Sequence, residues 1–82
     1  MIILSKEKIA CKLNFIGEEC FTIRIALMQK IKEIKIDEIL QLTTDNEKSI
    51  QSVPKWCRIN NQQLFLSDTE GSIFIYYIKR KS

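Results

Sequence analysis

The first regular pattern in the chain is an alternation of apolar and polar residues over positions 9–15. One side of this segment carries the apolar members, which are Ile9, Cys11, Leu13 and Phe15. Alternation at period two is typical of a β-strand with one buried face. We therefore predict a strand over residues 9–15, in which Cys11 points inward as a small apolar side chain.

From residue 20 the period changes to that of an α-helix. Apolar residues recur at spacings of three and four positions, at Ile23, Ala26, Leu27, Ile31 and Ile34. This spacing places them in one stripe along a helix. We predict a helix that begins at Cys20 and ends near residues 33–35, preceded by a short polar turn at residues 17–20.

A second strand and a second helix are expected next. Residues 38–43 are rich in apolar and β-branched side chains, which favours a strand. Asp45 or Asn46 can accept hydrogen bonds from the free N–H groups at a helix start. Asn60-Asn61 marks the helix end, because asparagine tolerates the left-handed conformation found there.

Within this second helix, the apolar residues Ile50, Val53 and Cys57 recur at helical spacing, so we expect all three to face the core. Trp56 is expected to be a core anchor. Pro54 cannot donate to the carbonyl four residues earlier, so it is expected to bend or divide the helix.

Two further strands complete the pattern, over residues 63–67 and 72–79, with a turn at residues 68–71 that contains Gly71. The last strand is apolar on both faces, which favours an interior position in the sheet. The resulting order predicts a two-layer α/β sandwich, with two helices on one face of a four-stranded mixed sheet.

The composition is that of a folded domain: 45% of the 82 residues are hydrophobic and 28% are charged. A chain of this length makes one domain, for which we expect a core over about residues 9–81. The net charge of +3 is a weak basic bias. Its clearest local cluster is Lys79-Arg80-Lys81, which with Tyr77 forms either a contact patch for protein or RNA, or a solubilising end to an apolar strand.

The apolar start Met1-Ile2-Ile3-Leu4 is shorter than the roughly 7 to 15 residues of a signal-peptide core. The run Ile73 to Ile78 is far shorter than the roughly 20 residues of a membrane-spanning helix. We therefore expect a soluble, cytoplasmic protein without a membrane partner, in which residues 1–8 form a frayed lead-in or a short edge segment.

Candidate chemistry is limited to thiolate, carboxylate and lysine, because the chain has no histidine. This excludes Cys-His pairs, Ser-His-Asp triads and histidine-ligated zinc. Three widely spaced cysteines predict free thiols. We expect Cys11 and Cys57 to be buried and slow to alkylate, and Cys20, at a helix start, to react first. The adjacent carboxylates Glu18-Glu19 have no evident partner for hydrolytic chemistry.

Several motifs occur in a familiar order: Leu13 and Gly17 before Cys20, then Thr44-Asp45, and later Val53-Pro54-Lys55-Trp56-Cys57. In these the chain resembles the TusA/SirA-like sulfur-carrier proteins from about Ile9 to Lys81. The resemblance implies a βαβαββ sandwich that holds sulfur as a persulfide on Cys20. It implies no cofactor, a cysteine-desulfurase-like donor protein, an acceptor protein, and only an indirect part for tRNA, in uridine thiolation or another sulfur relay.

The family's Cys-Pro-x-Pro motif is here Cys20-Phe21-Thr22-Ile23, without either proline. A diverged paralogue that acts as a non-catalytic protein- or RNA-binding module is therefore the alternative. Glu18 and Glu19 are expected to modulate the reactivity of the Cys20 thiol. The helix N-terminus favours a thiolate and the two carboxylates disfavour it, so we predict a pKa of Cys20 close to that of an ordinary free thiol.

Overall fold

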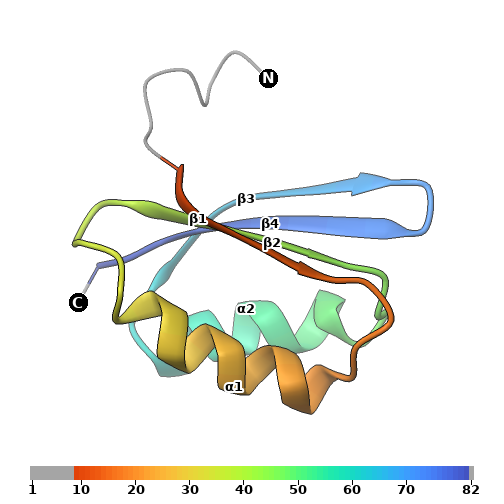
Figure 1. Cartoon of the computed structure of the whole chain (residues 1–82). Coiled ribbons are helices and arrows are strands. Elements are labelled where there is room, and N and C mark those ends of the chain that lie inside the picture. Colours follow the sequence, from red (N-terminus) through yellow and green to blue (C-terminus); the bar gives the residue numbers. More distant parts are fainter. Residues whose placement is uncertain (1–8, 82) are drawn as a thin grey trace.

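In a computed structural model of the chain, residues 9–81 are described; at Cys20 the description covers the backbone (Figure 1). The elements in order are β1 (Ile9–Phe15), α1 (Cys20–Ile31), β2 (Ile39–Thr44), α2 (Ser49–Ile59), β3 (Gln63–Glu70) and β4 (Ile73–Lys79). Both helices lie on the same face of the sheet. The predicted two-layer sandwich of βαβαββ order is confirmed. The prediction made for residues 1–8 lies outside the described residues.

The strands are arranged in the order β1-β2-β4-β3. β1 and β2 are parallel, and β4 is antiparallel to both β2 and β3. β4 is thus an interior strand, as predicted. The same arrangement fixes two opposite ends of the sheet: β1 and β2 finish at what we call the Phe15 end, whereas β4 finishes at the Lys79 end.

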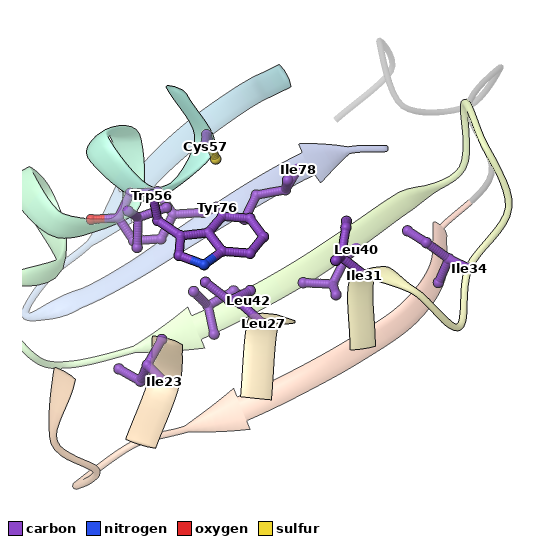
Figure 2. Close-up of a cluster of buried hydrophobic side chains, with 11 residues drawn as sticks. Ile23, Leu27, Ile31, Ile34, Leu40, Leu42, Trp56, Cys57, Tyr76 and Ile78 are labelled. Atoms are coloured by element: carbon purple, nitrogen blue, oxygen red, sulfur yellow. The ribbon is translucent and has the colours of Figure 1, made fainter. Parts of the chain in front are cut away.

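The core fills the space between the sheet and the two helices (Figure 2). The helices contribute Ile23, Leu27, Ile31, Val53, Trp56 and Cys57, and the sheet contributes Leu40, Leu42, Tyr76 and Ile78. Burial of each large aliphatic side chain in such a core contributes about 1.5–3 kcal/mol. The predicted stripe of α1 is confirmed from Ile23 to Ile31, as is the core position of Trp56. Ile34 is buried too, but it lies after the helix, which ends at Ile31 instead of near residues 33–35. None of the helices formed by residues 9–81 has the length and apolar character needed to cross a bilayer.

The inward side chains of β1 are only half-buried, including Cys11. β1 lies at the edge of the sheet, so it has a neighbouring strand on one side only. The expectation that Cys11 is buried was therefore too strong, because a periodic pattern gives the direction of a side chain and not its depth. Cys57, in contrast, is buried with 2% of its surface exposed.

α2 differs from its prediction in two ways. Ile50 is 55% exposed instead of facing the core, because the inward positions are Ser49, Val53, Trp56 and Cys57. Of the predicted bend or division at Pro54, the division does not occur, because the helix is continuous from Ser49 to Ile59. The carbonyl that Pro54 leaves without its usual donor belongs to Ile50, a residue on the wet side of the helix.

The hairpin between β3 and β4 is tighter than predicted. β3 extends to Glu70, which pairs with Ile73 across a two-residue loop. Gly71 occupies that loop with φ +64°, a conformation that favours glycine. The predicted turn over residues 68–71 was wrong because polar residues at an exposed sheet edge can continue a strand when an apolar neighbour pairs with them.

Candidate functional site

The segment before Cys20 is a β-turn that needs a glycine. The Glu18 N–H donates to the Phe15 carbonyl at 3.1 Å, which closes a four-residue turn. Gly17 is the third residue of that turn, with φ +82°. Positive φ at this position is typical of a type II turn. A side chain at Gly17 would meet open space, so the requirement for glycine is conformational.

This turn is held from the neighbouring strand. Asp45, directly after β2, accepts a hydrogen bond from the Gly17 N–H through Oδ1 at 2.9 Å. The next residue, Asn46, donates from Nδ2 to the Glu18 carbonyl at 3.4 Å. Since β1 and β2 are parallel and finish at the Phe15 end, their following loops meet there. The position of the segment before Cys20 is thus set partly by residues 28 positions away.

Asn46 also organises the start of α2. Its Oδ1 accepts from the Lys48 N–H at 2.9 Å, and its own N–H donates to Thr44 Oγ1 at 3.1 Å. The sequence left Asp45 and Asn46 open as acceptors for the start of this helix. Neither caps the helix itself, which begins at Ser49 without a side-chain cap: Asn46 accepts from the N–H of Lys48, the residue before the helix, and Asp45 turns toward Gly17.

Cys20 is the first residue of α1, and Glu19 is its N-cap. The Glu19 side chain makes no capping hydrogen bond, although its carbonyl accepts from Ile23 N–H at 3.1 Å. The N-terminus of a helix carries partial positive charge from backbone N–H groups that lack intrahelical partners. The backbone at Cys20 therefore lies where an anion is stabilised. Glu18 and Glu19, the predicted modulators, are both exposed beside it.

A hollow of about 410 Å³ lies at this end of the molecule, between the starts of the two helices. It is lined by Glu19, Phe21, Arg24, Asn46 and Lys48. The two positively charged residues of this lining, Arg24 and Lys48, were not predicted from the sequence. Arg24 is four residues after Cys20, a spacing that places two helical residues on one side, so it could have been found. Lys48 is the N-cap residue of α2, and only the fold brings it here.

The outer surface of α1 is more apolar than that of a typical surface helix. Phe21 is 61% exposed, and Ile25 and Met28 are also exposed. The three lie at i, i+4 and i+7, so they form a stripe that leads away from the hollow. We call these three residues the α1 stripe.

Cys57 is unsuited to thiolate chemistry. Burial raises the pKa of its thiol from 9.0 to about 12, because the charged form would lose its hydration. Cys11 is a half-buried strand residue. Both are in the apolar core or packed against it. Reactive thiols are found where the thiolate is accessible and electrostatically favoured, which leaves Cys20 as the candidate.

The basic cluster at residues 79–81 lies at the Lys79 end, opposite the Phe15 end and therefore far from Cys20. Arg80 points toward the helices, where Nη1 donates to the carbonyls of Ile34 and Lys32 after α1. Its backbone N–H also donates to the Glu38 carbonyl. Arg80 thus stabilises the segment between α1 and β2.

The other members of that cluster have different surroundings. Lys79 Nζ lies over the Phe65 ring, 4.9 Å from its centre, and Lys81 Nζ lies 3.4 Å from the Asp37 carboxylate. Tyr77 is half-buried on the sheet face that carries Lys79. The structure therefore brings Tyr77 and Lys79 to one face, and directs Arg80 away from them. Among the side chains that the structure describes, no three of Cys, Asp or Glu are grouped so that they could hold a metal ion.

Comparison with known proteins shows the family of the chain. The chain is similar to the sulfur carrier protein TusA of Buchnera aphidicola subsp. Baizongia pistaciae (strain Bp), with 28% identity over 54 residues, which covers 66% of this chain and 68% of that protein. It is also similar to the sulfur carrier protein TusA of Pseudomonas syringae pv. tomato (strain ATCC BAA-871 / DC3000), with 27% identity over 56 residues, 68% of this chain and 67% of that one. The family model described as sulfurtransferase TusA matches residues 12–80. A match over this much of the chain shows that it belongs to the TusA family.

Proposed function

We propose that this protein is a sulfur carrier, which accepts a sulfur atom, holds it as a persulfide on Cys20 and passes it to an acceptor protein. The observation that carries this proposal is the placement of Cys20 as the first residue of α1, directly after a turn fixed by Gly17 and Asp45. The two similar proteins are named sulfur carriers, which supports the same conclusion.

The proposed transfer needs no oxidant and no cofactor. The Cys20 thiolate attacks the outer sulfur of a donor persulfide, so that a new S–S bond forms at Cys20 and the donor S–S bond breaks. The donor cysteine leaves as a thiolate. The outer sulfur is transferred together with its proton, so the product on Cys20 is a persulfide that can exchange this proton with water. An acceptor thiolate then attacks the outer sulfur on Cys20, which restores the Cys20 thiolate.

The absence of both motif prolines is compatible with this function if the turn is held by other means. Proline in the first turn of a helix fixes φ and so rigidifies the start. In this chain the Asp45–Gly17 and Asn46–Glu18 hydrogen bonds constrain the segment from outside. Arg24, on the wall of the adjacent hollow, adds positive charge that favours an anionic sulfur.

The α1 stripe is the proposed contact surface for the donor and acceptor proteins. Three exposed apolar residues beside a reactive residue form the kind of patch that marks a protein interface. A cysteine-desulfurase-like protein is the proposed donor. Any connection with tRNA is then indirect, through the acceptor protein.

Intact mass measurement tests the proposal. We expect the reduced protein, after incubation with a small-molecule persulfide, to gain the mass of one sulfur atom, and to lose it when an excess of thiol is added. Cys20→Ser should not gain this mass, whereas Cys11→Ser, the matched control, should gain it as the wild type does. Sulfur that persists in Cys20→Ser, or its absence in the wild type, would contradict the proposal.

A further inference from the structure

The sheet has a second face, which neither helix covers (Figure 1). On β4 the side chains alternate, so that Tyr76 and Ile78 enter the helix-side core while Ile73, Ile75 and Tyr77 belong to the other face. We call this other face the open face. A sheet covered on one side usually carries polar residues on its open face.

The open face of β4 is apolar instead. Ile73, Ile75 and Tyr77 follow one another along the strand, and Leu66 of β3 pairs with Tyr77 beside them. We call these four residues the β4 stripe. All four are only partly buried within the described part of the chain. On the other side of the stripe, β2 contributes the polar residues Gln41 and Thr43 and, beside Lys79, the buried Ile39. An apolar strip with a polar border is typical of an interface.

The charges around the β4 stripe differ between its two ends. Asp68 and Glu70 of β3 pair with Ile75 and Ile73, so their carboxylates lie at the start of β4. Lys79 lies at the other end, on the same face, over Phe65. Lys79 is six positions after Ile73, which corresponds to about 20 Å along the strand. The stripe is therefore acidic at one end and basic at the other.

We propose that the β4 stripe is covered by a second copy of this chain, in an antiparallel, two-fold symmetric dimer. A two-fold axis between the sheets, perpendicular to β4 at the level of Tyr76, places the acidic end of each copy over the basic end of the other. Glu70 then faces the partner's Lys79. Ile75 packs against the partner's Tyr77, whose hydroxyl can donate to Asp68. Two twisted sheets pack in this way at about 10 Å, with their strands roughly aligned.

The dimer is expected to be weak. A stripe about 20 Å long on two strands about 5 Å apart covers much less than the roughly 800 Å² per partner of a standard interface. We therefore expect a dissociation constant in the micromolar range or weaker. α1 lies on the opposite side of the sheet, so Cys20 stays outside this interface and the proposed sulfur chemistry is independent of it.

Sedimentation equilibrium of the full chain, over concentrations up to about 1 mM, tests the proposal, since weak dimers are populated only there. We expect a monomer–dimer equilibrium that weakens as salt rises. Lys79→Glu alone, and Asp68→Lys with Glu70→Lys, should each weaken it at least tenfold by placing like charges together. When the two variants are mixed, opposite charges face each other again and a heterodimer should form.

The control variant is Lys55→Glu, which changes the same charge on the exposed surface of α2 and should leave dimerisation unchanged. Far-UV circular dichroism and urea unfolding verify that each variant is folded. A wild-type protein that stays monomeric at every concentration overturns the proposal. A dimer that ignores the charge variants, or a mixture that does not form heterodimers, also overturns it.

Discussion

The Asp45 carboxylate accepts a hydrogen bond from the backbone N–H of Gly17, at 2.9 Å, across the two loops that follow β1 and β2. Gly17 is three residues before Cys20, so the loop after β2 constrains the approach to the candidate sulfur site. This relationship gives the site a rigid support that does not depend on the prolines found in related motifs.

Asp45→Ala is expected to lower the free energy of unfolding by about 1 kcal/mol, because it removes one charge-assisted hydrogen bond at an exposed position. It should also slow sulfur uptake by Cys20, since the preceding turn is less constrained. Asp45→Asn keeps an oxygen acceptor at Oδ1 and is the matched control. Urea unfolding and the rate of mass gain measure the two effects. Equal behaviour of the two variants would mean that the Gly17 hydrogen bond has no role.

The charges around Cys20 are expected to set its reactivity. Each nearby carboxylate disfavours a thiolate by about 0.6 kcal/mol in a water-like dielectric. Glu18→Gln with Glu19→Gln should therefore speed alkylation by iodoacetamide at pH 7 by about two- to fivefold, and Arg24→Gln should slow it. Both effects should shrink at high salt. Lys35→Gln, at the opposite end of the sheet, should change nothing; a response as large as that of Arg24→Gln would show that only net charge matters.

The three thiols are expected to alkylate in the order Cys20, Cys11, Cys57. Cys11 is half-buried at a sheet edge, whereas Cys57 is buried and its raised pKa keeps it protonated. A limiting dose of iodoacetamide followed by peptide mass mapping determines the order. Urea should abolish the difference between Cys11 and Cys57, because it arises from the fold. Labelling of Cys57 before Cys20 in the folded protein would refute this assignment.

The buried Cys57 thiol is expected to make the protein less stable in alkali. Burial raises its pKa from 9.0 to about 12, so between these values the folded state holds a proton that the unfolded state releases. The stabilisation that results from this raised pKa is fully present below pH 9. Above pH 9 the free energy of unfolding should fall by about 1.4 kcal/mol per pH unit. Urea unfolding at several pH values should show a shallower decline in Cys57→Ala. Burial also raises the pKa of Tyr76, but this residue is present in both proteins, so its effect cancels in the comparison. Parallel profiles would contradict the prediction.

Arg80 and Lys81 are expected to contribute differently to stability although they are neighbours. Arg80→Ala removes donors to the Ile34 and Lys32 carbonyls and should cost about 1.5–3 kcal/mol. Lys81→Ala breaks only an exposed ion pair with Asp37 and should cost less than about 0.5 kcal/mol. Urea unfolding of the two variants makes the comparison.

The same two variants test an RNA-contact role for residues 79–81. If these residues bound phosphates as a patch, each variant would weaken tRNA binding and reduce its salt slope by about one. We expect no such parallel effect, because Arg80 is directed toward the helices while Lys81 is paired with Asp37 at the surface.

Much of the fold could be read from local patterns. The period-two alternation of residues 9–15 and the stripe from Ile23 to Ile34 each record which side of an element is buried, and burial on one side largely fixes the element type. The order of the elements then left few sensible arrangements. The predicted burial of Ile50 was wrong because a short apolar pattern fits more than one rotation of the helix about its axis. The predicted turn at residues 68–71 was wrong because pairing with β4 keeps these polar residues in a strand.

Local patterns predicted the elements, their order and the place of Cys20 at a helix start. They did not predict the contacts between distant parts of the chain: Asp45 with Gly17, Lys48 near Arg24 on the wall of the hollow, and, at the far end of the sheet, Arg80 with the Ile34 carbonyl. This is because periodicity encodes the burial of each element separately. A hydrogen bond or a charge pairing between residues far apart in the chain depends on how strands are ordered and where their ends meet, and no local pattern records that.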